Sequence, residues 1–159
     1  IIRLDIGAIL NEYNGDAAQT LPVGEISPLA QRLLQVTEES LYKGIAQAQV
    51  GNRLFDISHA VQKHVEAHGF SVVRDFCGHG IGREMHESPN IPNYGQPGHG
   101  PRLKAGYCLA IEPMVNVGTY EVSVLEDDWT TVTDDGELSA HFEHSIAVTD
   151  DGPIILTAL

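Results

Sequence analysis

Three carboxylates lie inside short segments that otherwise have the apolar character of buried strands. They are Asp5, Glu112 and Glu143, and each is flanked by a large apolar residue on at least one side. Burying an ionised carboxylate is costly unless the group is paired or bound to a cation, because the charge loses its hydration. Any fold that buries these segments must therefore bring a cation or another partner to the three side chains.

Two further side chains stand in comparable settings. Asp16 follows Gly15 in a polar, turn-like stretch, and His79 lies in the segment Gly78–Gly82, in which every second residue is glycine. Glycine permits unusual backbone angles and close approach, which a structural histidine seldom needs. Converging carboxylates repel one another unless divalent cations neutralise them, and four carboxylates with one histidine suit a pair of transition-metal ions. The candidate ligands are Asp5, Asp16, His79, Glu112 and Glu143.

The other histidines have settings that leave more than one role open. His86 lies seven residues after His79 and either polarises a substrate carbonyl or simply faces water. His141 and His144 flank Glu143 and are candidates for orienting it through hydrogen bonds. Exposed or capping roles are predicted for His59, His64, His68 and His99.

Composition narrows the class of protein. The chain has 159 residues, of which 42% are hydrophobic, and this is typical of one packed domain over residues 1–159. Lysine and arginine total 9 against 22 aspartates and glutamates, which gives a formal charge of −13. So acidic a chain lacks the electrostatic attraction to phosphate on which nucleic-acid binding depends.

The sequence also argues against several other classes of protein. The sequence has no run of about 18 apolar residues that would predict a membrane span. Its first residues do not resemble a secretory signal, so the cytoplasm is the expected compartment. Cys77 and Cys108 are too few for a disulfide framework, and we expect buried free thiols. Motifs for phosphate-binding loops, serine hydrolases and HExxH zinc enzymes are absent from the sequence.

Hydrophobic periodicity predicts an α+β domain that begins with a hairpin. Residues 1–12 alternate as in a half-buried strand, residues 12–16 predict a turn, and a second extended run near residues 17–23 follows. Such a hairpin could bring Asp5 opposite Asp16.

Two helices are expected next. Ser27 and Pro28 are typical of a helix start, and the apolar stripe behind them predicts a helix to about Ala48. A shorter helix is predicted over residues 54–65, with Gly69 as its C-terminal stop.

The second half of the chain is predicted to be mostly sheet. A glycine-rich loop is expected around His79, and residues 86–106, which have no clean period, are expected to form an ordered loop. The strand candidates are residues 70–73, 107–117, 130–133, 142–148 and 154–157.

Five ordered motifs together resemble type I methionine aminopeptidase over essentially the whole chain. These motifs are Leu4–Gly7, Gly15–Leu21, Gly78–Pro89, Leu109–Met114 and Ser139–His144. The resemblance implies the pita-bread (creatinase/aminopeptidase) fold, which is an α+β architecture with a mainly antiparallel curved sheet. One local difference is that Gln19 and Leu21 stand where the family usually has an arginine and an aromatic residue.

The resemblance also implies a site for two divalent metal ions, with Co, Mn, Fe or Zn as the candidates. Carried over position by position, Asp5 would chelate one metal, and Asp16 and Glu143 would bridge the two. His79 and Glu112 would complete the second metal.

The implied reaction is removal of the N-terminal methionine from nascent polypeptides, by a hydroxide held between the ions. Glu112 would shuttle the proton, and His86 would stabilise the tetrahedral intermediate. Met85 and Trp129 would line the pocket for the methionine side chain. The implied partners are N-terminal peptides of nascent chains near the ribosome, without direct binding to nucleic acid or membrane, and the complete enzyme would be a monomer.

Family members carry an additional N-terminal segment that supplies a helix pair, part of the sheet, most of the methionine pocket and another catalytic histidine. We therefore expect this chain to be a C-terminal portion of such an enzyme, incomplete at its N-terminus. Its sheet would have an open edge and an exposed apolar face, and its isolated activity would be weak or absent.

Two alternatives remain at this point. A proline-specific exopeptidase of the aminopeptidase P or prolidase type shares the five-ligand scheme, although the short interval from His79 to His86 and the motif at residues 140–144 favour the methionine enzyme. A non-catalytic binding module on the same scaffold would be expected to lose ligands, and the sequence retains all five candidates.

Overall fold

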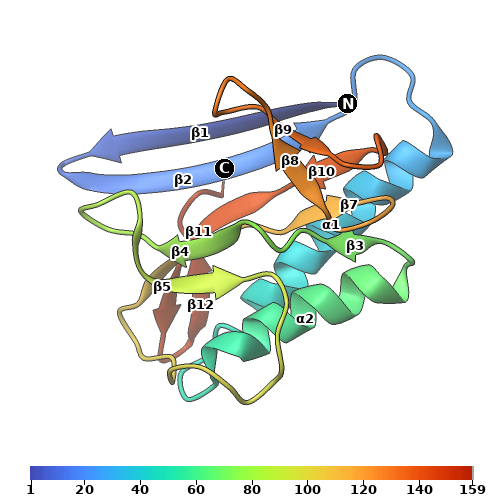
Figure 1. Ribbon diagram of the computed structural model, residues 1–159. Helices are drawn as coiled ribbons and strands as arrows, with labels where there is room; N and C mark the ends of the chain where they lie inside the picture. Colours follow the sequence, from blue (N-terminus) through green and yellow to red (C-terminus); the bar gives the residue numbers. More distant parts are fainter. Residues whose placement is uncertain (159) are drawn as a thin grey trace.

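Strands from both halves of the chain meet in a curled antiparallel sheet, with helices against one of its faces (Figure 1). The computed structural model describes residues 1–158. Its strands are β1 (Ile2–Leu10), β2 (Tyr13–Leu21), β3 (Ser71–Val72), β4 (Cys77–Gly80), β5 (Glu87–Pro92), β6 (Cys108–Ile111), β7 (Met114–Asn116), β8 (Val122–Val124), β9 (Thr131–Thr133), β10 (Ser139–His141), β11 (Glu143–Thr149) and β12 (Gly152–Ile155).

The largest sheet joins the first hairpin of the chain to its last strands. Its order is β1-β2-β11-β6-β4-β5, and β12 also pairs with β11. Neighbouring strands in it are antiparallel. A smaller sheet has the order β10-β7-β3, and β8 pairs with β9. The predicted α+β class with a mainly antiparallel curved sheet is therefore confirmed.

The helices α1 (Pro28–Ile45) and α2 (Leu54–Ala67) pack against each other and against strands of both sheets. One buried cluster joins them to β6 and β11, and it includes Leu41, Ile45, Leu54, Ile57, Leu109, Ile111, Ile146 and Val148. A second cluster joins them to the smaller sheet, and it includes Leu33, Val36, Val61, Val65, Val72, Val115 and Ala140. Removal of this apolar surface from water is the main force that holds the helices on the sheet.

The start of α1 agrees with the prediction, and its end does not. Ser27 Oγ accepts a hydrogen bond from Ala30 N at 3.2 Å, so this side chain caps the helix as expected. The helix ends at Ile45 rather than near Ala48, because the next amides donate three residues back: Ala48 N bonds to Ile45 O at 2.9 Å. Such bonds tighten the chain into turns and end the α-helical ladder. The predicted stop of α2 is confirmed, since Gly69 has φ 80.

The hairpin between β1 and β2 is tighter than predicted. Its turn consists of Asn11 and Glu12, whose φ values are 50 and 68, so β2 begins at Tyr13. Two consecutive residues with positive φ are typical of the two-residue turns that match the twist of antiparallel strands. Asp5 pairs with Ala18 rather than lying opposite Asp16.

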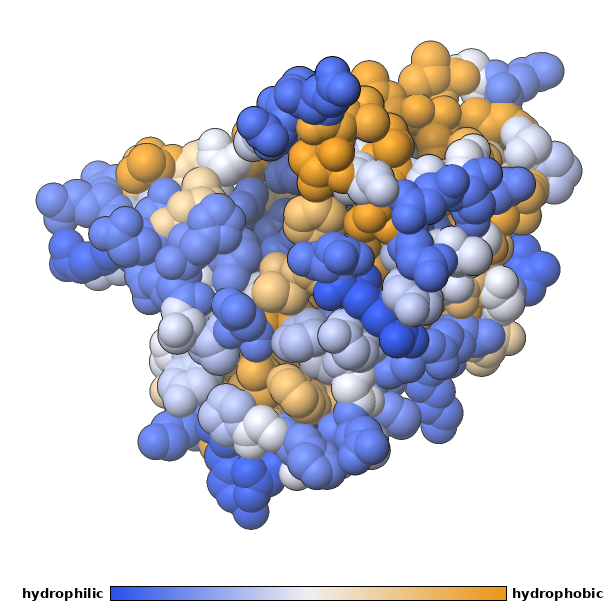
Figure 2. Space-filling model, viewed as in Figure 1, coloured by the Kyte–Doolittle hydropathy of each residue, from blue (hydrophilic) through white to orange (hydrophobic). Residues whose placement is uncertain are grey.

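β1 is exposed along its whole length, so the prediction of a half-buried strand was wrong. Its side chains include Ile6, Ile9 and Leu10, which are 65%, 71% and 76% exposed. Among the described residues β1 is the end of the sheet order, and the hairpin extends away from the helices (Figure 1). The expected open edge and exposed apolar side chains are therefore present in residues 1–158. Figure 2 shows further apolar side chains gathered over the region of β8 and β9.

Four strands were not predicted from the sequence: β4, β5, β8 and β10. β4 replaces the loop expected around His79, because Gly78 and Gly80 hide the alternation by which a strand is recognised. A Cβ atom at Gly78 would overlap the backbone carbonyl of Ala110 on β6. Glycine is thus needed here for close approach between neighbouring strands. Cys77 and Cys108 are free thiols as expected, but they are half-buried rather than buried.

The length and hydrophobicity of the helices can be compared with what a membrane span requires. Neither α1 nor α2, nor any other helix in residues 1–158, is long and apolar enough to cross a bilayer.

Candidate metal centre

Two adjacent cross-strand rows place the predicted ligands on one face of the large sheet. In the first row Asp5 on β1 is opposite Ala18 on β2, and Ala18 is opposite Glu143 on β11. Glu112 directly follows the last residue of β6 and is level with Glu143. Because directly opposed residues in a sheet point to the same face, these three carboxylates share a face around the small side chain of Ala18.

The second row lies two residues further along the strands. Asp16 precedes Ala18 by two positions on β2, and its backbone N and O bond to the hydroxyl of Ser145 on β11, at 2.9 and 2.8 Å. Ser145 is opposite Ala110 on β6, and Ala110 is opposite His79 on β4. A step of two residues keeps the same face, so Asp16 and His79 join the carboxylates of the first row.

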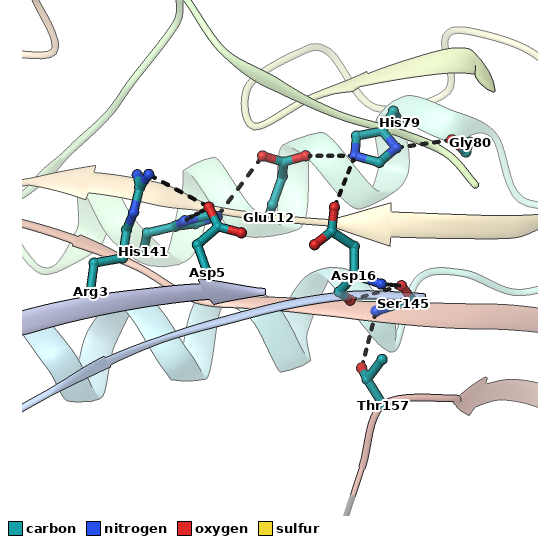
Figure 3. A network of polar contacts seen from close by, with 9 residues as sticks. All are labelled: Arg3, Asp5, Asp16, His79, Gly80, Glu112, His141, Ser145 and Thr157. Carbon is teal, nitrogen blue, oxygen red and sulfur yellow. Dashed lines mark hydrogen bonds and ion pairs between the residues drawn. The ribbon is translucent and has the colours of Figure 1, made fainter. Parts of the chain in front are cut away.

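The ligand atoms of this face converge (Figure 3). His79 Nε2 lies 3.4 Å from Glu112 Oε1 and 4.0 Å from Asp16 Oδ2. One ligand atom each of Asp16, His79 and Glu143 lies within 4.8 Å of the others. These separations leave room for an ion between oxygen and nitrogen donors that are each about 2.0 to 2.2 Å away from it.

The ring of His79 is oriented by its own strand. Its Nδ1 lies 2.9 Å from Gly80 O, and since a carbonyl oxygen only accepts, Nδ1 carries the proton. The lone pair is therefore on Nε2, which faces Asp16 and Glu112 (Figure 3). A backbone carbonyl that fixes the ring in this way is a common feature of histidine ligands to metals.

The electrostatics of the centre favour a bound cation. Burial, followed by repulsion from Asp16 and Asp5, raises the pKa of Glu112 to about 8. Burial, followed by repulsion from Glu112 and the two aspartates, raises the pKa of Glu143 to about 9. Burial and then Asp5 also raise the pKa of Asp16. A divalent cation would reverse these shifts, because it stabilises each ionised carboxylate.

A buried oxygen of Glu143 supports the same conclusion. Within residues 1–158 its Oε1 is buried and has no hydrogen-bond partner. An unpartnered buried acceptor costs free energy, and a metal ion would satisfy it. The donor set of carboxylates and imidazole therefore fits a divalent transition-metal ion.

His141 lies beside this group, although the sequence suggested it only as a partner of Glu143. Its Nδ1 is 3.8 Å from Asp5 Oδ2, and its Nε2 is 3.9 Å from Glu112 Oε2 (Figure 3). Burial lowers the pKa of His141 to about 3, so the ring is neutral at ordinary pH. The suggestion that His144 orients Glu143 was wrong, because adjacent residues of a strand face opposite sides. His144 instead contacts Thr157 Oγ1 at 2.8 Å.

Four side chains of the centre were missed by the sequence analysis. Arg3 lies 3.5 Å from Asp5, and Ser145 holds the backbone of Asp16. Thr20 Oγ1 donates to His141 O at 2.8 Å, and Asn93 Nδ2 donates to Glu112 O at 3.0 Å. Arg3, Thr20 and Ser145 each stand an even number of residues from a candidate ligand on the same strand. The period of two could therefore have identified three of the four.

The predicted substrate residues are placed less uniformly than the ligands. The His86 ring is exposed, and its centroid is 4.4 Å from that of His79. Met85 is half-buried and lies where a side chain at Gly7 would otherwise be. Trp129 is 86% exposed and lines a cavity of about 600 Å³ whose wall also includes Arg3 and His141. His86 and Met85 thus lie beside the ligands, whereas Trp129 shares a cavity wall with Arg3 and His141.

This combination of fold and carboxylate–histidine cluster belongs to a class of metallopeptidases. Residues 1–150 match the model of metallopeptidase family M24, and the chain belongs to this family. It is 59% identical to the methionine aminopeptidase of Clostridium acetobutylicum, over 99% of this chain and 63% of that protein. It is also 59% identical to methionine aminopeptidase 1 of Bacillus subtilis, with the same two coverages.

Solved structures give the same fold. The methionine aminopeptidase of Thermotoga maritima matches with a TM-score of 0.97 and 51% identity, over 99% of this chain and 63% of that one. The prolidase of Pyrococcus furiosus matches with a TM-score of 0.76 at 22% identity, over 99% of this chain and 41% of that one, and this likeness shows the fold alone. The chain spans about 63% of the length of the curated relatives named above.

Proposed function

We propose that this chain is the metal-binding part of a methionine aminopeptidase, which hydrolyses the peptide bond after an N-terminal methionine. The observation that carries the proposal is the convergence of the predicted ligands on one face of the sheet. The choice of substrate is supported by 59% identity to proteins named methionine aminopeptidase. The activity is proposed for the whole protein, because the chain spans 63% of those relatives.

The proposed centre holds two divalent ions of the Mn, Fe, Co or Zn type. Asp5 would chelate one ion, Asp16 and Glu143 would bridge both, and His79 and Glu112 would complete the second. Such ions, when bound, lower the pKa of water and stabilise negative charge that develops on a substrate oxygen.

Side chains of this chain would carry out the remaining steps of the hydrolysis. The carboxylate of Glu112 would accept the proton of the attacking water and return it to the leaving amine. His86, beside His79, would donate a hydrogen bond to the substrate carbonyl oxygen as that oxygen gains charge. Met85 and Trp129 would contact the methionine side chain of the substrate.

The wider setting is also part of the proposal. Residues 1–159 would form one, partial, catalytic domain, and nascent polypeptides near the ribosome in the cytoplasm would be its substrates. The complete enzyme would be a monomer that binds neither membrane nor nucleic acid directly. The formal charge of −13 supports the last point, because it opposes approach to a phosphate backbone.

The test is hydrolysis of a Met-Ala-Ser peptide in the presence of Mn²⁺ or Co²⁺. It is run on this chain and on a chimera that carries, ahead of Ile1, the residues that precede the match in the Bacillus subtilis relative. We expect cleavage by the chimera and little or none by the chain alone. Asp16→Asn in the chimera is the control for contaminating peptidases and is expected to be inactive.

An Xaa-Pro dipeptide is assayed in parallel. Cleavage of this dipeptide but not of Met-Ala-Ser would move the assignment to a proline-specific exopeptidase. A chimera that binds metal but cleaves neither peptide would contradict the peptidase proposal and favour a binding module.

A further inference from the structure

A second group of metal-ligating side chains lies on the helices, outside the centre described above. Glu39 is on α1, and His64 is on α2, with His68 directly at the end of α2. One ligand atom of each residue lies within 4.8 Å of the other two. The sequence predicted exposed or capping roles for both histidines. His68 does occupy the C-cap of α2, but both rings are half-buried.

The three side chains are held in place by hydrogen bonds. His64 Nε2 lies 3.0 Å from Glu39 Oε2, and Gln35 Nε2 donates to Glu39 Oε1 at 2.8 Å. His68 Nδ1 donates to His64 O at 2.8 Å, so the lone pair of the His68 ring is on Nε2. The two rings are one helical turn apart, and their centroids are 4.5 Å from each other.

Exposure and charge at this place suit a cation. The His64 side chain is 16% exposed and that of Glu39 is 42% exposed, so an ion could enter from solvent without opening the core. The hydrogen bond from Gln35, followed by the one from His64, holds the pKa of Glu39 below its ordinary value, and this carboxylate is therefore ionised. The chain as a whole is strongly acidic. The guanidinium of Arg32 is a nearby positive charge, but it is bound to the backbone O of His68 at 3.1 Å.

We propose that Glu39, His64 and His68 form a separate metal site that binds Zn²⁺ and ties α1 to α2. Two imidazoles with one carboxylate are a donor set that zinc prefers, with water in the fourth position. The ion would replace the direct hydrogen bond between His64 and Glu39. Magnesium and calcium are not expected here, because they favour sites made of oxygen ligands.

The geometry requires only a small adjustment for this exchange. Donors about 2.0 to 2.2 Å from a tetrahedral ion lie roughly 3.4 Å from one another. The 3.0 Å between His64 Nε2 and Glu39 Oε2 must therefore widen slightly, while any separation near 4.8 Å must close, and the partly exposed Glu39 side chain has the freedom to move. Because the two helices supply different ligands, the bound ion would oppose their separation and stabilise the folded chain.

The experiment is equilibrium dialysis against Zn²⁺, with zinc per chain measured by mass spectrometry. The wild-type chain is compared with His64→Gln and His68→Gln, and His59→Gln on the same helix is the matched control. We expect each of the first two variants to bind one zinc fewer per chain, and the control to bind as many as the wild type. Glutamine at position 64 can still donate to Glu39, so the helices should keep their packing, which circular dichroism checks.

A second comparison distinguishes zinc bound at this site from zinc bound at the carboxylate centre on the sheet. In an Asp16→Asn, Glu143→Gln background, zinc that remains bound should be lost on addition of His68→Gln. Zinc should also raise the melting temperature of this background and should not raise it once His68→Gln is added. Unchanged zinc content in His64→Gln and His68→Gln, with native circular dichroism, would overturn this site whether or not the chain proves to be a peptidase.

Discussion

The ligands of the candidate centre differ in how firmly the chain encloses them. The side chains of His79, Glu112 and Asp16 are 7%, 10% and 13% exposed, whereas that of Asp5 is 39% exposed and contacts Arg3. An enclosed carboxylate has lost its hydration before the ion binds, so its negative charge depends more on that ion. Asp16 and its neighbours should therefore contribute more to metal affinity than Asp5.

The first prediction concerns Asp16. Asp16→Asn is expected to lower the affinity for Mn²⁺ by about 100-fold or more, because a proposed bridging carboxylate becomes a neutral amide. Asp5→Asn should have a smaller effect, and the exposed Asp151→Asn should have none. Isothermal titration calorimetry measures all three. An Asp16→Asn chain with wild-type stoichiometry and affinity would remove Asp16 from the ligand set.

The second prediction concerns His86. His86→Ala is expected to lower the turnover of Met-Ala-Ser by roughly 100-fold, as for the loss of one hydrogen bond to a developing oxyanion. Metal content should not change, because His86 is proposed to touch the substrate rather than the ions. The assay uses the chimera described above, with His99→Ala as the control. Loss of metal from His86→Ala would instead place this side chain among the ligands.

At the scale of the element, the cross-strand rows determine how the site is built. Ala18 separates Asp5 from Glu143 in one row, and Ala110 separates Ser145 from His79 in the next. These small side chains leave space above the sheet, and an ion held by the larger neighbouring side chains could lie in that space. The sheet therefore presents ligands and room for an ion together.

The third prediction tests this use of a small residue. Ala18→Val is expected to weaken Mn²⁺ binding by about 10-fold or more, because the added methyl groups enter the space between Asp5 and Glu143. Ala17→Val is the matched control, since the next residue of the strand points to the opposite face. Calorimetric titration of both variants gives the comparison. Equal affinities would show that the space above Ala18 is not used.

At the scale of the whole molecule, the metal-free chain concentrates buried negative charge. Glu112 and Glu143 have pKa values of about 8 and about 9, against 4.5 for an ordinary glutamate. Between about pH 4.5 and these raised values, Glu112 and Glu143 therefore keep protons in the folded chain that they have already released in the unfolded chain. The contribution of these protonated groups to stability is full below about pH 4.5 and is lost as pH rises through about 8 and about 9.

The fourth prediction follows from this difference. Between about pH 6.5 and 8.5 the free energy of unfolding of the metal-free chain should fall as pH rises, by at most about 1.4 kcal/mol per pH unit for each group. This window lies above the range in which His141, with its pKa lowered to about 3, would add an opposite slope. Urea unfolding at several pH values measures the effect.

Two comparisons make this measurement specific to the centre. Glu112→Gln with Glu143→Gln should flatten the slope, because neither amide titrates. Saturating Mn²⁺ should restore stability at the high-pH end, since the ion favours the ionised carboxylates. A wild-type profile as flat as that of the double variant would contradict the raised pKa values.

Particular elements show how far local patterns could predict this fold. Ser27 with Pro28 identified the start of α1, and Gly69 identified the end of α2, because caps depend on the residues beside them. β4 was missed, since its glycines carry no apolar alternation. The burial of β1 was predicted wrongly because a period of two does not reveal what lies against either face of a strand.

The sequence by itself determined the chemical types at the centre, the order in which they occur along the chain, and the family to which they point. Carboxylates in apolar segments and a histidine between glycines can be recognised locally, because the cost of burying charge and the freedom of glycine are local properties. Only the tertiary structure decided which of these side chains meet. Strand order and register bring Asp5 level with Glu143, and Asp16 level with His79, from widely separated parts of the chain. The same is true of Glu39, His64 and His68, since the packing of α1 against α2 brings them together.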